Sequence, residues 1–175
     1  MQYQEVHLQQ FLLRHNESRY LHTEVLDYTR KGRPVELLKI EAPAEPGTTD
    51  LPRKTIFLTS RHHCGETMAT YALEGILDAA LEDSKLGRAI RRHLVIYAVP
   101  FVDKDGVVDG DQGKNRRPHD HARDYGDAPI YPEIRSIMQL LNQIRPELVM
   151  DLHCPWLYSG PTNERIYFVG QKSQK

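Results

Sequence analysis

The stretch KTIFLTSRHHCGE, residues 54–66, decides the fold. Its first half has an unbroken apolar centre, which predicts a strand over 54–60 buried on both faces, as in a sheet covered by helices on both sides. Its second half changes abruptly to histidine, cysteine, glycine and glutamate. Open α/β sheets bind ligands at the carboxyl ends of their strands, so the chemistry is expected where this strand ends.

Apolar patterns before and after this stretch alternate between the periods of strand and helix. Predicted strands cover 23–28, 35–40, 93–100, 147–152 and 166–169, and predicted helices cover 5–13, 66–82 and 132–144. Such alternation predicts an α/β fold, with a mostly parallel or mixed central sheet and helices on both of its faces. At 175 residues the chain is long enough to bury a core, and we expect one domain over 1–175.

Composition argues against two classes of partner. The formal net charge is only -1, so no strong field attracts nucleic acid or an acidic membrane. No stretch approaches the ~20 consecutive apolar residues of a membrane span, and the polar start MQYQE lacks the pattern of a signal peptide. We therefore expect no nucleic-acid partner, no membrane partner and a cytoplasmic location.

Three side chains at two strand ends have the pattern of a zinc site. His63 and Glu66 are three residues apart at a strand-to-helix turn, and His153 follows the predicted strand 147–152. Two histidines and a carboxylate, with a fourth position open to water, are typical of one catalytic Zn²⁺ ion. A histidine-x-x-glutamate pair alone also fits a salt-bridged helix start, but its position after a buried strand and the third ligand favour the metal.

Each of the two cysteines, Cys64 and Cys154, directly follows one of these histidines. Two cysteines cannot form a disulfide framework, and we interpret them as reduced, partly buried thiols. A single disulfide or an additional metal ligand remains an alternative.

Residues 101–130 are poor in apolar side chains and too long for a simple connector, which predicts a functional loop. A calcium loop is one alternative for its acidic part, which contains Asp103, Asp105, Gly106, Asp109, Gly110 and Asp111. That part lacks the final bidentate glutamate of an EF-hand at the required spacing, so an acidic turn is the preferred interpretation.

In four ordered places the sequence resembles the zinc metallocarboxypeptidases, the carboxypeptidase A-like family. GRPVELLKI at 32–40 is similar to the opening hairpin, and HCGE at 63–66 to the histidine-x-glycine-glutamate zinc motif. VPFVDKDGV at 99–107 resembles a segment that usually reads asparagine-proline-aspartate-glycine-valine, from which Asp103 and Lys104 depart. DLH at 151–153 resembles the aspartate-x-histidine motif of the third ligand.

The segment DHARDY at 120–125 resembles the motif that binds the terminal carboxylate of the substrate. The resemblance implies that Arg123 is the carboxylate clamp and that Asp120 accepts a hydrogen bond orienting a ligand histidine. Ala122 stands where the family has asparagine, so either the site is altered or Arg123 binds alone. Arg116, with Arg117 as second choice, is the candidate for stabilising the oxyanion, and a solvated basic loop is the alternative for both.

The resemblance implies a zinc-dependent hydrolase that releases the C-terminal residue of a peptide. The family's general-base glutamate lies far beyond the third ligand, and we find no match for it, since Glu164 fits a surface loop better. We therefore expect the N-terminal part of a longer catalytic domain, incomplete at its C-terminus. Its exposed sheet edges would favour a homo-oligomer. The alternatives are a zinc deacylase of N-acyl amino acids and a catalytically incompetent fragment that binds metal or peptide.

Overall fold

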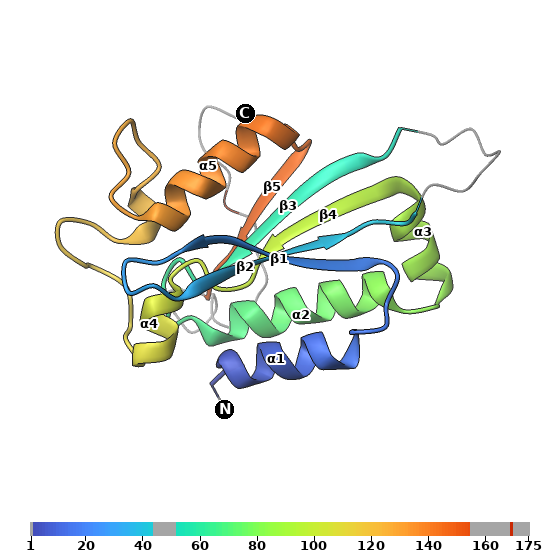
Figure 1. Cartoon of the computed structure of the whole chain (residues 1–175), viewed down its shortest axis with the longest axis horizontal. Helices are drawn as coiled ribbons and strands as arrows, with labels where there is room; N and C mark the ends of the chain where they lie inside the picture. The colour runs from blue at the N-terminus through green and yellow to red at the C-terminus, as the bar shows by residue number, and fades with distance from the viewer. Residues whose placement is uncertain (1, 44–51, 155–168, 170–175) are drawn as a thin grey trace.

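A mixed sheet forms the centre of the computed structural model, which describes residues 2–43, 52–154 and 169 (Figure 1). Its strands lie in the order β1-β2-β4-β3-β5. Their bounds are Leu21–Tyr28 for β1, Pro34–Ile40 for β2, Lys54–Ser60 for β3, Leu94–Val99 for β4 and Leu148–Leu152 for β5. The β1–β2 and β2–β4 pairs are antiparallel, whereas β3 runs parallel to β4 and to β5.

Helices cover both faces of this sheet (Figure 1). Helices α1, α2 and α3 lie on one face and α5 on the other, with a short α4 beyond the strand ends. Their bounds are Glu5–Arg14 for α1, Thr67–Leu81 for α2, Lys85–His93 for α3, Lys104–Asp109 for α4 and Pro132–Ile144 for α5. The predicted α/β class with a mixed sheet is confirmed.

Strand β3 lies inside the sheet because side chains of both its faces enter a core. Leu58 packs in the cluster with α1 and α2, while the neighbouring Phe57 packs in the cluster with α5. Near its carboxyl end Thr59 pairs with Val99 of β4 and Asp151 of β5. The parallel strands therefore deliver the turn after β3, the loop after β4 and the end of β5 to one edge of the sheet.

Two α-helices were not predicted from the sequence. The predicted strand 93–100 begins one residue later, because α3 extends to His93. Helix α3 has few apolar residues, but Ser84 caps it by accepting a hydrogen bond from the Gly87 N–H at 3.0 Å. The sequence signals of this helix were thus a capping serine at its start and a cluster of basic residues in its last turn. It has no long apolar stripe.

The second missed helix, α4, lies inside the segment predicted as a loop. Asp103 caps it by accepting a hydrogen bond from the Gly106 N–H at 2.9 Å, and Gly110 ends it with φ 75°. Most of the acidic residues of the calcium alternative are paired with cations instead. Asp103 pairs with Arg116, and Asp105 and Asp109 pair with Arg33.

Residues 166–168 of the predicted last strand lie outside the described residues. Among the helices that are described, none is long and apolar enough to cross a bilayer.

Candidate metal centre at the strand ends

The turn after β3 is held by Arg61, a buried residue in the left-handed backbone region at φ 65°. Its guanidinium donates hydrogen bonds to the Cys64 carbonyl at 2.6 Å and to the Tyr3 carbonyl at 2.9 Å. A bulky residue rarely adopts this conformation unless the surrounding contacts impose it, and such residues cluster at functional sites. The turn presents His62 and His63 immediately after this residue.

The three predicted ligands come together. Nδ1 of His63 lies 3.1 Å from Oε1 of Glu66, and Nδ1 of His153 lies 2.8 Å from Oε2 of Glu66. One ligand atom from each of the three side chains lies within 4.8 Å of the others. Two imidazole nitrogens and a carboxylate at this separation match the donor chemistry of a catalytic zinc site, in which the fourth position belongs to water or substrate.

Electrostatics also favour a cation between these side chains. Burial would raise the pKa of Glu66, but hydrogen bonds from His153, His63 and Lys114 hold it well below the usual range, so the carboxylate is ionised. Burial would lower the pKa of His153, but hydrogen bonds to Asp151 and Glu66 raise it to about 10. The Glu66 carboxylate thus attracts positive charge from three sides, and a metal ion bound there would replace protons.

Asp120 lies behind His63. It is buried, its Oδ2 lies 3.8 Å from Nε2 of His63, and its Oδ1 has no hydrogen-bond partner among the described residues. A carboxylate facing the ring nitrogen opposite the ligand nitrogen is the usual arrangement behind a metal-bound histidine. The orienting role of Asp120 stays a prediction, and this geometry is compatible with it.

Arg123 ends a short 3-10 helix, His121–Arg123, and is exposed to solvent. The next residue, Asp124, is buried and accepts hydrogen bonds from the Ile130 and Tyr131 N–H groups at 3.0 and 2.9 Å. The hydroxyl of Tyr125 lies 2.6 Å from Nε2 of His62. The two residues that follow Arg123, Asp124 and Tyr125, thus fix this segment through their hydrogen bonds. The assignment of Arg123 as the carboxylate clamp stays a prediction.

The candidates for the oxyanion cation lie in different surroundings. Arg116 pairs with Asp103 at 2.8 Å and with Asp111 at 2.7 Å, and Arg117 is exposed. Among the residues that the structure describes, neither guanidinium pairs with His63, Glu66 or His153, and the role of Arg116 stays a prediction.

Lys114 is a functional candidate that the sequence did not single out. Its Nζ lies 2.6 Å from Oε1 of Glu66, directly against the ligand set. The preceding Gly113 has φ 86°, and a Cβ there would lie 2.6 Å from the Cys64 backbone nitrogen. A glycine at position 113 thus lets the loop pass against the His63 turn and bring Lys114 to Glu66. The sequence has no helical or strand periodicity here that would have predicted this contact.

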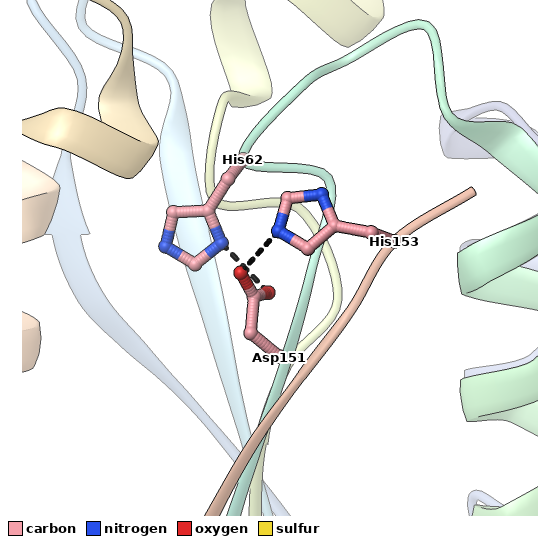
Figure 2. Close-up of side chains that lie close together, drawn as sticks. All are labelled: His62, Asp151 and His153. Atoms are coloured by element: carbon pink, nitrogen blue, oxygen red, sulfur yellow. Dashed lines mark hydrogen bonds and ion pairs between the residues drawn. The ribbon is translucent and has the colours of Figure 1, made fainter. Parts of the chain in front are cut away.

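A second group of potential metal ligands, His62, Asp151 and His153, adjoins the first and shares His153 with it (Figure 2). Neither group contains a cysteine, within the part of the chain that the structure describes. Cys64 is buried, Cys154 is half-buried, and both are free thiols.

Comparison with known proteins identifies the family. A family model described as zinc carboxypeptidase matches residues 11–128. Cytosolic carboxypeptidase 3 of Mus musculus is 28% identical over 155 residues, and the match covers 87% of this chain but 15% of that protein. Cytosolic carboxypeptidase-like protein 5 of Mus musculus is 30% identical over 171 residues, covering 85% of this chain and 19% of that protein.

A solved structure has the same fold. The metallo-carboxypeptidase from Burkholderia cenocepacia superposes with a TM-score of 0.74 at 23% identity, covering 88% of this chain and 42% of that one. The chain thus spans less than half of the solved structure and a smaller part of both relatives. The family model covers most of the chain, including the His63 turn and the Arg123 segment. By that match, the chain belongs to the zinc carboxypeptidase family.

Proposed function

We propose that residues 1–175 form one zinc carboxypeptidase-like core, part of a hydrolase that releases the C-terminal residue of a peptide. The observation that carries this proposal is the convergence of His63, Glu66 and His153, whose ligand atoms lie within 4.8 Å of one another. The relatives support it, because they are named carboxypeptidases. Their names also support a cytosolic location.

In the proposed reaction, different residues of this chain bind the metal, orient a ligand and bind the substrate. His63, Glu66 and His153 hold one zinc ion, which when bound supplies Lewis acidity for a peptide carbonyl and for a water molecule. Asp120 fixes the orientation of the His63 ring. Arg123 binds the free carboxylate at the end of the peptide, because a guanidinium offers two parallel N–H donors to a carboxylate.

A cation near the scissile carbonyl completes the proposed site. Lys114 joins Arg116 as a candidate, since its ammonium already lies against Glu66 at 2.6 Å. Preorganised donors that face the developing negative charge of an acyl-transfer transition state contribute roughly 10²–10³ in rate.

Metal analysis tests the ligand set directly. The purified chain is expected to hold one zinc ion, and His63→Ala and His153→Ala are expected to lose it. His22→Ala is the matched control, since His22 lies exposed in β1. Zinc retained at full stoichiometry in both ligand variants would contradict the proposed site.

Substrate assays test the reaction. A protein that releases the last residue from a peptide with a free C-terminus, but not from its C-terminally amidated twin, would behave as the Arg123 clamp requires. Turnover of N-acyl amino acids alone would indicate a deacylase. Zinc binding without turnover of either substrate would indicate a chain that binds metal but does not catalyse.

A further inference from the structure

Four side chains form a series of hydrogen bonds that ends at a proposed zinc ligand. The Tyr125 hydroxyl lies 2.6 Å from Nε2 of His62, and Nδ1 of His62 lies 2.8 Å from Oδ1 of Asp151. The other oxygen of Asp151, Oδ2, lies 2.6 Å from Nε2 of His153. Figure 2 shows the carboxylate of Asp151 between the two imidazole rings.

The directions of these hydrogen bonds follow from the carboxylate. An ionised carboxylate only accepts hydrogen bonds, and Asp151 also receives one from the Thr59 hydroxyl at 2.9 Å. Nε2 of His153 therefore donates to Asp151, and Nδ1, which faces Glu66 at 2.8 Å, is the nitrogen on which a metal ion would replace a proton. A neutral His62 that donates through Nδ1 accepts through Nε2, so the Tyr125 hydroxyl donates to it.

His62 is well placed to act through its neighbours instead of binding substrate itself. It is 2% exposed, and both of its ring nitrogens have partners. Its two contacts join the segment that contains Arg123, through Tyr125, to the end of strand β5, through Asp151, and His153 directly follows this strand. The segment of the proposed carboxylate clamp and the third proposed metal ligand are thus connected by three consecutive hydrogen bonds.

We infer that His62 is a positioning residue, which fixes Asp151 and through it the ring of His153, and that Tyr125 ties this support to the Arg123 segment. The inference rests on the proposed zinc site, because it assigns a role to His62 toward that site. Beyond that site, metal affinity would then depend on a residue that two hydrogen bonds separate from the ligand His153.

The same residues could hold a second metal ion, since His62, Asp151 and His153 also satisfy the spacing of a ligand group. His153 faces Glu66 with Nδ1 and Asp151 with Nε2, so two ions would require it to bind through both ring nitrogens as an imidazolate, whereas one ion requires only the neutral ring. Metal stoichiometry separates these interpretations.

Cobalt substitution tests the inference with a signal other than activity. The affinity for Co²⁺ and the visible d–d spectrum of the bound ion are measured for the wild type, His62→Leu, His62→Gln and Tyr125→Phe. Losing a partner of this kind lowers metal affinity by about 10–100-fold, which is expected for His62→Leu together with a shifted spectrum. His62→Gln keeps an N–H donor for Asp151 and is expected to recover part of both.

Tyr125→Phe removes one neutral hydrogen bond and is expected to lower cobalt affinity by about fivefold. The matched controls are His22→Leu and Tyr28→Phe, because both residues lie exposed in β1. If His62→Leu fails to fold by circular dichroism, the Gln and Phe variants carry the test.

The outcomes are distinguishable. A wild type that binds no Co²⁺ contradicts the zinc site itself. One ion per chain in the wild type, with unchanged affinity and spectrum in His62→Leu, His62→Gln and Tyr125→Phe, overturns the positioning role alone. Two ions per chain that fall to one in the His62 variants would also overturn it, in favour of a second metal site.

Discussion

Two clusters of charged side chains differ in how completely their partners satisfy them. In the closed cluster, Lys104 lies 2.7 and 3.0 Å from the carboxylate oxygens of Glu36 and 2.9 Å from Glu5. In the open cluster, ligand atoms of His63 and Glu66 from the turn after β3 and of His153 from the end of β5 lie within 4.8 Å of one another. The Lys104 side chain has no exposed area, whereas 35% of the His153 side chain is exposed.

The difference separates a structural from a functional arrangement of charge. In the closed cluster the cation is part of the chain, so the charges are neutralised by folding and no ligand is required. In the open cluster a carboxylate with a strongly lowered pKa is shared by two histidines and a lysine. Donor atoms that converge from separate strand ends, and remain accessible, are what a mobile cation needs.

Breaking the closed cluster is expected to have the largest effect on stability. Lys104→Met leaves the carboxylate of Glu36 buried without its cation, and this is expected to lower the free energy of unfolding by about 3–5 kcal/mol. Urea denaturation measures the change. The double variant Lys104→Met, Glu36→Leu is expected to recover most of the loss, because both charges are then gone.

The control for this prediction is Lys31→Met. Lys31 pairs with Asp109 on the surface, where 57% of the lysine side chain is exposed. Exposed pairs contribute about 0–1 kcal/mol, so this variant is expected to unfold nearly as the wild type does. Similar losses for Lys31→Met and Lys104→Met would remove the distinction between the clusters.

Filling the open cluster is expected to have the next largest effect. Zinc that binds only the folded chain, at a free concentration 100 times its Kd, should raise the free energy of unfolding by about 2.7 kcal/mol. A chelator should remove this increment, and His63→Ala should abolish it. Lys104→Met should retain the increment on a lower baseline, because its charges are not part of the metal site.

The sequence predicted the elements whose signals are local. The bounds of β3 and α5 were predicted as observed, because a continuous apolar run marks β3 and Pro132 marks the start of an apolar helical stripe in α5. The proximity of His63, Glu66 and His153 was also expected, since His63 and Glu66 have fixed spacing and His153 follows a recognisable strand, whereas their role as metal ligands stays a prediction. The structure places the three together.

What the sequence did not reveal depends on the path of the chain through space. Lys104 is buried only because Glu36 and Glu5, which lie in other elements, neutralise its charge. The sequence alone therefore did not explain why a lysine stands at this position of the family motif. Lys114 reaches Glu66 only because the loop passes over the His63 turn. The contact between Tyr125 and His62 likewise joins positions 63 residues apart.

Lys114 provides a smaller test, because its ammonium competes with a metal ion for Glu66. Two unit charges about 4 Å apart interact by roughly 4 kcal/mol near a protein surface, and the side chain can partly swing away. Lys114→Met is therefore expected to raise zinc affinity about tenfold, or about 1.4 kcal/mol, measured by competition with a chromophoric chelator.

Arg116→Met is the matched comparison for Lys114. It removes a cation from buried Asp103 instead of Glu66, so it is expected to lower stability and to change zinc affinity by less than about threefold. A larger gain in zinc affinity for Arg116→Met than for Lys114→Met would reverse the assignment of the two cations.

Cys64 directly follows the proposed ligand His63, is buried, and offers the smallest test of the open cluster, through the reactivity of its thiol. Burial, followed by the negative charge of Asp103, raises the pKa of the Cys64 thiol to about 12. The thiolate is the reactive form, so at pH 8 Cys64 should react roughly 10³-fold more slowly than an ordinary thiol of pKa about 8.5. Labelling of the Cys154→Ala variant with a disulfide reagent isolates this signal.

The pH dependence of that labelling identifies the state in which Cys64 reacts. Reaction in the folded state should accelerate about tenfold per pH unit up to pH 10, because the thiolate fraction keeps rising below a pKa near 12. Reaction through an opened state should level off above about pH 8.5, where an exposed thiol is already ionised. Rapid labelling with the pH profile of a free thiol would contradict the burial of Cys64 beside the proposed ligand His63 and would extend the solvent-accessible part of the site to this residue.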